Sequence, residues 1–240
     1  MKSGDVAPDS APDPIPGSMA EEGMTAEQYA RHQRGRRRTV RRDSGKKLRL
    51  IARYGGPGPV LDVGTGPGIV LRELARRLPP GTAIHGIDVD PSMIDLAREE
   101  LADFPGVQLA RVDAQGILPF ADEEFAIVHS EYCFHHLRDL ESTALEIRRV
   151  LRPNGLLLLV DIDPRNWMSR LFRRLYPAWR AARLGWPVAD AAYHSIQRAR
   201  SFDSLIDLLN RSGFRVRYQR RSRIRRLVAA VKAPRAAAGQ

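Results

Sequence analysis

The sequence predicts an α/β fold built on a doubly wound, mostly parallel sheet. Short apolar runs such as residues 60–63 alternate with longer stretches, such as residues 69–78, whose apolar residues recur at helical spacing. Three closely spaced glycines join these two segments, as in folds that hold a ligand between a strand and a helix. A chain of 240 residues suits one such domain with an insertion.

The glycine loop at residues 64–68 is the first candidate binding site. Gly64 and Gly66 have no Cβ and can take positive φ, so the backbone can approach a ligand closely, while Gly68 lets the next helix pack tightly. A dinucleotide fingerprint would need glycine in place of Ile69, and no Gly-Lys-Ser/Thr of a P-loop follows. Asp62, two residues before the loop, can orient it or meet a cationic ligand.

Five segments occur in an order that matches a known family. They are Val-Leu-Asp-Val-Gly-Thr-Gly-Pro-Gly at 60–68, Gly-Ile-Asp-Val-Asp at 86–90, Asp-Ala at 113–114, Phe-His-His-Leu at 134–137 and Arg-Val-Leu-Arg-Pro-Asn-Gly at 149–155. Over roughly residues 44–232, the chain resembles the class I S-adenosylmethionine (SAM) methyltransferases, in the broad type 11 group that includes ubiquinone/menaquinone methyltransferases. The resemblance implies a Rossmann-like seven-stranded sheet with an antiparallel terminal strand, and SAM as cofactor.

The resemblance also implies roles for individual residues. Asp88 ends the second strand, where it can accept hydrogen bonds from both ribose hydroxyls. Met93 is expected against the adenine, and Asp113 and the Ala114 N–H are expected to meet the adenine amino group and a ring nitrogen. Ser130 and Glu131 are expected beside the methionine moiety. The predicted cofactor-binding residues are Asp62, Gly64, Thr65, Gly66, Gly68, Asp88, Val89, Met93, Asp113, Ala114, Ser130 and Glu131.

No residue is singled out as catalytic. The sulfonium of SAM already activates the methyl group, so a protein base is optional, and alignment and exclusion of water matter more. Tyr132, His135, Tyr193 and His194 are candidate bases, and the sequence does not rank them. His135 and His136 have no Cys, Asp or Glu at metal-ligand spacing, so a structural role is favoured and no metal is predicted.

The formal net charge of +11 is unevenly distributed. Residues 1–54 contain 12 Lys/Arg and 7 acidic residues, residues 55–163 contain 9 and 18, and residues 164–240 contain 18 and 3. The acidic middle part suits a sulfonium cation, whereas the basic flanks could attract nucleic acid, anionic lipid or an acidic partner. Only four of the 39 basic residues are Lys, so the arginine excess could equally reflect a GC-rich genome.

Three segments are predicted along the chain: a disordered tail at 1–23, a basic helical cap at 24–54, and a methyltransferase domain at 55–240. A lid is predicted as an insertion at 164–200. Its stripe comprises Trp167, Met168, Leu171, Phe172 and Leu175, with further aromatic surface from Trp179, Trp186 and Tyr193. This stripe could cover an apolar acceptor, lie on an anionic membrane surface, or pack in the core.

The predicted function is methyl transfer from SAM to a small, apolar or aromatic metabolite that resembles a natural product, a quinone or a lipid. Two alternatives stay open: a methyltransferase acting on RNA or protein, with nucleic-acid binding not favoured, and a non-catalytic SAM-binding subunit. Cys133 is the only cysteine, no apolar run is long enough to span a membrane, and the N-terminus has no apolar signal region. We therefore expect a cytoplasmic location.

Overall fold

A computed structural model describes residues 24–181, 187–222 and 225–234. The expected disordered tail at 1–23 and Trp186 of the expected lid lie outside these residues. The fold is a seven-stranded sheet in the order β3-β2-β1-β4-β5-β7-β6, in which β7 is antiparallel to both neighbours. The strands are β1 Val60–Val63, β2 Ile84–Asp88, β3 Val107–Arg111, β4 Phe125–Glu131, β5 Leu151–Ile162, β6 Phe214–Arg221 and β7 Arg225–Lys232. The predicted doubly wound sheet is confirmed.

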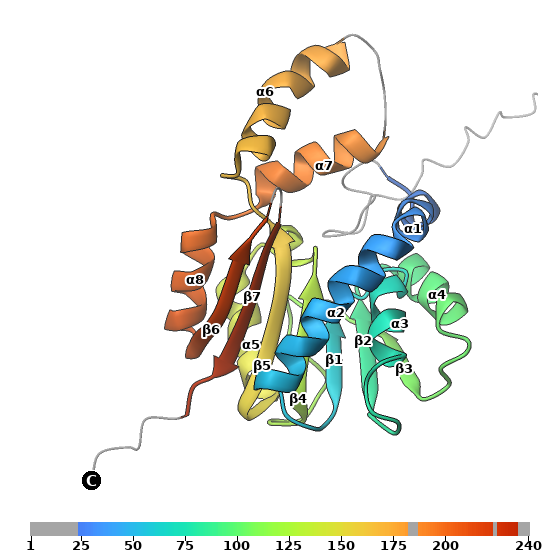
Figure 1. Cartoon of the computed structure of the whole chain (residues 1–240), viewed down its shortest axis with the longest axis vertical. Helices are drawn as coiled ribbons and strands as arrows, with labels where there is room; N and C mark the ends of the chain where they lie inside the picture. Colours follow the sequence, from blue (N-terminus) through green and yellow to red (C-terminus); the bar gives the residue numbers. More distant parts are fainter. Residues whose placement is uncertain (1–23, 182–186, 223–224, 235–240) are drawn as a thin grey trace, which may run out of the picture.

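Helices cover both faces of this sheet (Figure 1). On one face, α2 and α3 bury Leu50, Ile51 and Leu74 against β1, β4 and β5. On the other face, α5 and α8 bury Ile147 and Leu205 in the largest apolar cluster. The helices of the described chain are α1 Ala26–Gly35, α2 Arg37–Tyr54, α3 Ile69–Ala75, α4 Pro91–Glu100, α5 Leu140–Val150, α6 Trp167–Ala181, α7 Pro187–Arg198 and α8 Phe202–Arg211, with a 3₁₀ turn η2 at Phe134–His136.

The ends of several helices follow from local side-chain chemistry. Thr25 and Gln28 form a capping box at the start of α1, in which each side chain accepts a hydrogen bond from the other residue's backbone N–H. Asp90 accepts from the N–H of Ser92 at the start of α4, with Pro91 as the first helical residue. The local sequence therefore fixes where these helices begin.

Strand β5 is longer than the fully apolar run at residues 156–160 within it. It begins at Leu151, and residues 153–155 form an irregularity near its start. Leu151 pairs with Phe125 and Leu156 with Ile127, so β5 advances five residues while β4 advances two. The surplus residues bulge outward around Asn154, whose φ of 61° is tolerated because Asn enters the left-handed region at low cost.

The basic N-terminal helices are attached to the domain by ion pairs. The Lys47 ammonium of α2 is 3% exposed and pairs with the Glu131 carboxylate at the end of β4. Asp43 of α2 accepts a hydrogen bond of 2.7 Å from Arg225 of β7, and Arg37 donates to Glu100 of α4 at 2.7–2.8 Å. Some of the Lys and Arg charges of residues 24–54 are therefore neutralised by acidic side chains of the chain itself.

No helix in the described residues is both long and apolar enough to cross a bilayer.

The buried pair between Lys47 and Glu131 gives a stability prediction. Lys47→Met should lower the free energy of unfolding by about 3–5 kcal/mol, because Glu131 would be left buried without its counter-charge. Urea denaturation followed by circular dichroism measures this change. In the matched control Lys46→Met, the partner Asp43 is 4.0 Å away and the Lys side chain is 39% exposed. That control should cost less than about 1 kcal/mol.

The double variant Lys47→Met/Glu131→Gln should regain most of the lost stability, because it removes both charges. Equal and small effects of the Lys46 and Lys47 substitutions would show that the pair does not stabilise the attachment of α2.

Candidate functional site

The site lies where parallel strands end at one edge of the sheet. Val63 of β1 is in register with Ile87 of β2 on one side and with Ser130 of β4 on the other. The residues that follow these positions are Gly64, Asp88 and Glu131, so the register brings three segments that are distant in sequence to one place. The carboxyl ends of strands beside the first strand are where ligands bind in this fold class.

The glycine loop needs its glycines for different reasons. Gly64 and Gly66 have φ of 72° and 54°, in the left-handed region that favours glycine. A Cβ on Gly64 would lie 2.6 Å from the Cβ and Sγ atoms of Cys133, so no side chain fits there. The Gly66 N–H donates a 2.8 Å hydrogen bond to Asp88 Oδ2, which holds the loop against the end of β2.

A hollow opens beside this loop, with an empty volume of about 680 Å³ that includes solvent at its mouth. Among the described residues, four carboxylates and no Lys or Arg line it, so the lining favours a cationic ligand. Eight of the twelve predicted cofactor residues contribute. The lining comprises Tyr29, Gly64, Gly66, Ile87, Asp88, Val89, Asp90, Met93, Val112, Asp113, Ala114, Gln115, Glu131, Tyr132, Cys133, His136 and Leu137.

The other four predicted residues are outside the lining of this hollow: Asp62 and Thr65 line a smaller hollow of about 360 Å³ that shares the loop residues Gly64 and Gly66 with it, and Gly68 and Ser130 line neither. The Asp62 carboxylate is buried and meets the His129 ring at 2.6 Å. The Ser130 hydroxyl points into the sheet and donates to the Val63 carbonyl at 2.8 Å. Gly68 packs against Ala97 of α4, where a Cβ would approach to 3.1 Å. Gly68 and Ser130 therefore support neighbouring segments, and Thr65 is buried in the loop itself.

The Asp88 carboxylate is the most perturbed acid of the hollow. Burial raises its pKa to about 6, although hydrogen bonds from the backbone N–H groups of Asp90 and Gly66 act in the opposite direction. Each carboxylate oxygen accepts one of these N–H groups and keeps a further lone pair for a ligand. Asp113 Oδ1 likewise accepts from the Gln115 N–H at 2.9 Å.

Several lining residues were not among the predicted cofactor-binding residues. Tyr29 comes from α1, and only the folded arrangement brings it to 3.8 Å from the position of a Cβ on Gly66. Tyr132, which the sequence named only as a candidate base, has a φ of 57°, an uncommon backbone state that marks functional sites in many proteins, and burial raises the pKa of its hydroxyl to about 12. Leu137 belongs to the recognised segment 134–137 and Cys133 directly precedes it, so their proximity to the site could have been anticipated.

The candidate bases differ in whether they line the hollow. His135 is buried, and its Nδ1 lies 2.6 Å from Asp161 Oδ1, outside the lining of the hollow. Its neighbour His136 lines the hollow instead, and burial holds the pKa of that imidazole well below its usual value. Tyr193 of α7 stacks on Tyr176 of α6, with 4.3 Å between ring centroids. Tyr193 and His194 do not contribute to the described lining.

The predicted lid stripe divides into two faces. Tyr176 stacks on Tyr193 of α7, and Phe172 lies against Tyr176 with 5.5 Å between ring centroids. Trp167, Leu171 and Leu175 are exposed instead of covering the hollow. The reason is helical geometry: these three residues are spaced by four, so they share a side that Phe172 does not.

A second hollow of about 470 Å³ lies next to the first, and Glu131 lines both. Five basic side chains and two acids line it. They are Lys46, Lys47, Arg220, Arg225 and Arg226, with Asp43 and Glu131. Arg226 is only 2% exposed and donates to the Arg200 carbonyl at 2.6 Å. An acidic hollow and a basic hollow therefore share one wall.

Comparisons with known proteins agree with this arrangement. Residues 61–159 match the family model of a methyltransferase domain. The chain is 35% identical over 130 residues to a ubiquinone/menaquinone biosynthesis C-methyltransferase from Geobacter sulfurreducens, covering 52% of this chain and 48% of that protein. It is 32% identical over 162 residues to a demethylmenaquinone methyltransferase from Tropheryma whipplei, covering 65% of each. The matches thus span about half to two thirds of these relatives.

Solved structures show the same architecture. A SAM-dependent methyltransferase from Aquifex aeolicus superposes with a TM-score of 0.61 at 21% identity, covering 80% of this chain and 90% of that one. The domain match assigns a methyltransferase domain to residues 61–159, and the superposition shows that the chain shares the fold of this solved enzyme. The residues at the sheet edge fit SAM, because the glycine loop admits close approach and the hollow is acidic.

The pKa of Asp88 gives a prediction for cofactor binding. If its carboxylate accepts hydrogen bonds from SAM, only the ionised form can bind well, so SAM affinity should be constant above about pH 7. It should fall by about tenfold per pH unit below about pH 6. Isothermal titration calorimetry across this range measures the change.

The control is Asp88→Asn, which should bind SAM weakly and with little dependence on pH. A wild-type affinity that stays flat down to about pH 5 would contradict the assignment of Asp88 as the titrating acceptor.

Proposed function

We propose that this chain transfers a methyl group from SAM to a small aromatic acceptor of the quinol type. The observation that carries the proposal is the acidic hollow at the strand ends, built on Gly64, Gly66 and Asp88. The names of the similar proteins from Geobacter sulfurreducens and Tropheryma whipplei support a quinone-like acceptor.

In this proposal each part of SAM contacts different lining residues. Asp88 accepts hydrogen bonds from the ribose hydroxyls, and Met93 packs against the adenine. Asp113 and the backbone N–H of Ala114 meet the polar edge of that base. All four line the hollow, and Asp88 keeps a free lone pair on each carboxylate oxygen. Glu131, which also lines the hollow, is left for the methionine moiety.

The acceptor approaches from the side of Tyr132, His136 and Leu137. These residues give the hollow aromatic and apolar contacts, which suit an aromatic ring better than a sugar or a peptide. A ring oxygen of the acceptor would lie toward the basic hollow that shares Glu131, where five basic side chains against two acids favour its anionic form. An anionic ring oxygen makes the adjacent ring carbon more nucleophilic.

SAM supplies a methyl group that its positive sulfur already activates. The remaining work for the chain is to align the acceptor in line with that group and to keep water out. His136, neutral because of burial, can accept the proton that the acceptor ring loses. Tyr132 is unsuited to this task, because a hydroxyl with a pKa of about 12 remains protonated near neutral pH.

The test uses labelled SAM with 1,4-naphthoquinol as the acceptor, under reducing conditions. We expect label in the organic phase and a product heavier by one methylene, identified by mass spectrometry. His136→Gln should lower the rate about 10²-fold or more while SAM affinity stays within about twofold, because a general base acts only on the chemical step.

Incubation of the same labelled SAM with a cell extract separates the alternatives. Label recovered in RNA or in protein, with none in organic-soluble material, would overturn the proposal in favour of a macromolecular acceptor. SAM binding without transfer to any fraction would indicate a non-catalytic SAM-binding subunit.

A further inference from the structure

The outer side of α6 carries an apolar face that no described part of the chain covers. Trp167, Leu171 and Leu175 are 65%, 47% and 56% exposed. The described chain has five exposed large hydrophobic side chains, and these three are among them. They are spaced by four residues on one helix. Scattered exposed apolar residues are ordinary on a protein surface, but a contiguous row of them marks a contact site.

The inner side of α6 accounts for the packing of this helix. Tyr176 is 3% exposed and stacks on Tyr193 of α7, and Phe172 and Trp179 lie against Tyr176 at 5.5 and 5.8 Å between ring centroids. The exposed row is therefore not needed to hold α6 on the domain. Its large apolar residues require another explanation.

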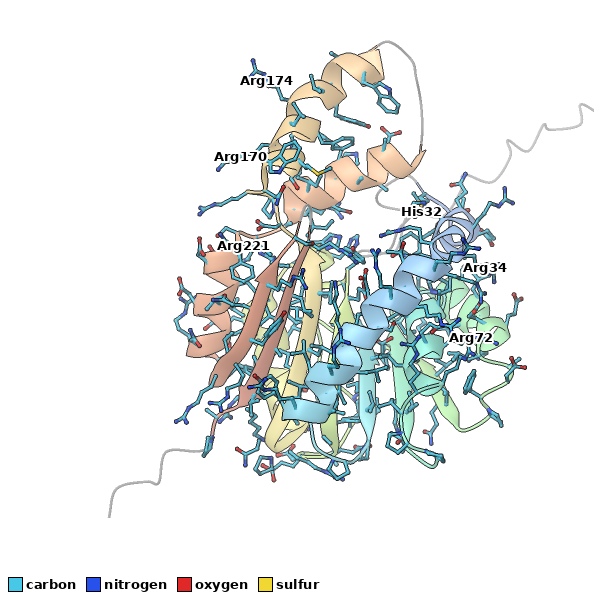
Figure 2. The ribbon with its side chains drawn as sticks, in the orientation of Figure 1. His32, Arg34, Arg72, Arg170, Arg174 and Arg221 are labelled. Atoms are coloured by element: carbon cyan, nitrogen blue, oxygen red, sulfur yellow. The ribbon has the colours of Figure 1, made fainter. Side chains whose placement is uncertain are left out.

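Arginines border the exposed row. Arg170 and Arg174 are exposed and lie three residues after Trp167 and Leu171. Figure 2 shows both side chains extending outward from α6. An aromatic and two leucines bordered by arginines form the pattern of a helix that lies flat in the interface of an anionic bilayer, with the guanidinium groups at the level of the headgroups.

We propose that the face formed by Trp167, Leu171 and Leu175, together with Arg170 and Arg174, docks on an anionic lipid surface. Charge decides between this occupant and a second copy of the chain. Two copies meeting through this face would bring their arginine rows together, whereas anionic lipid headgroups neutralise them. Residues 164–240 contain 18 Lys/Arg and 3 acidic residues, so the same part of the chain adds long-range attraction to such a surface.

The placement of α6 connects docking to the site. Figure 1 shows α6 and α7 beyond the end of the sheet at which β4 and β5 finish, which is the end that carries the hollow. Docking through α6 would hold this end of the molecule near the lipid. The inference itself stands on exposure and charge, and does not depend on the proposed methyl acceptor.

The test is co-sedimentation of the full chain with vesicles of phosphatidylcholine alone or mixed with phosphatidylglycerol. We expect binding to the mixed vesicles, weakening as salt is raised, and little binding to pure phosphatidylcholine. Leu171→Ser/Leu175→Ser should weaken binding by about tenfold or more. The matched control is Leu145→Ser on α5, a leucine that is 51% exposed on another helix and should change nothing.

A second pair of variants separates local contact from net charge. Arg170→Gln/Arg174→Gln should weaken binding to the mixed vesicles more than Arg215→Gln/Arg217→Gln, which removes the same charge from exposed positions on β6. Circular dichroism melting checks that all variants fold, and calorimetry with SAM checks that the site is intact.

Two results would overturn the proposal. One is wild-type binding that is equal for the two vesicle types or is lost equally in the control variants. The other is a mass in light scattering that doubles with concentration and returns to that of a monomer in Leu171→Ser/Leu175→Ser, since this would assign the face to a second copy.

Discussion

The hydrogen bond from the Gly66 N–H to the Asp88 carboxylate is the contact on which the site depends most. It joins the loop after β1 to the end of β2 at 2.8 Å, and it is possible only because Gly66 takes a φ of 54°. The partner oxygen of the same carboxylate accepts the N–H of Asp90, which in turn caps α4. The Asp88 carboxylate therefore positions both the glycine loop and the start of α4. Its remaining lone pairs can accept hydrogen bonds from a ligand.

Charge separation is the second organising feature. A chain with a net charge of +11 lines its main hollow with four carboxylates and, among the described residues, with no Lys or Arg. The excess positive charge is held elsewhere, in the adjoining basic hollow and on α6. Asp62, His129, Glu131 and Lys47 form a buried row from β1 to α2, with Glu131 3.9 Å from His129 and paired with Lys47.

Much of the fold followed from the sequence. The apolar strand at 60–63 and the glycine loop are local signals, and the structure has both where the sequence predicted. Eight of the twelve predicted cofactor residues line the hollow because they lie at strand ends or in the loop, which the fold class brings together.

The remaining features depend on long-range contacts that no local pattern encodes. Tyr29 reaches the hollow because α1 packs on the domain, and His129 meets Asp62 because β4 pairs with β1 in one register. Ser130 alternates to the inner side of β4 and so bonds to Val63 rather than facing the hollow. The stripe on α6 could be read from its spacing, but only the packing of Tyr176 against Tyr193 shows which side faces outward.

The central claim is that the Asp88 carboxylate contacts the ribose of SAM as well as the loop. Substituting Asp88 alone cannot test it, because the loop would lose its Gly66 contact in the same variant. The direct measurement is a cycle: calorimetry of SAM and of its 2′,3′-dideoxy analogue with the wild type and with Asp88→Ala. The account predicts that the wild type prefers SAM by about 2–4 kcal/mol and that the variant has nearly lost this preference. An equal preference for SAM in both proteins would contradict it.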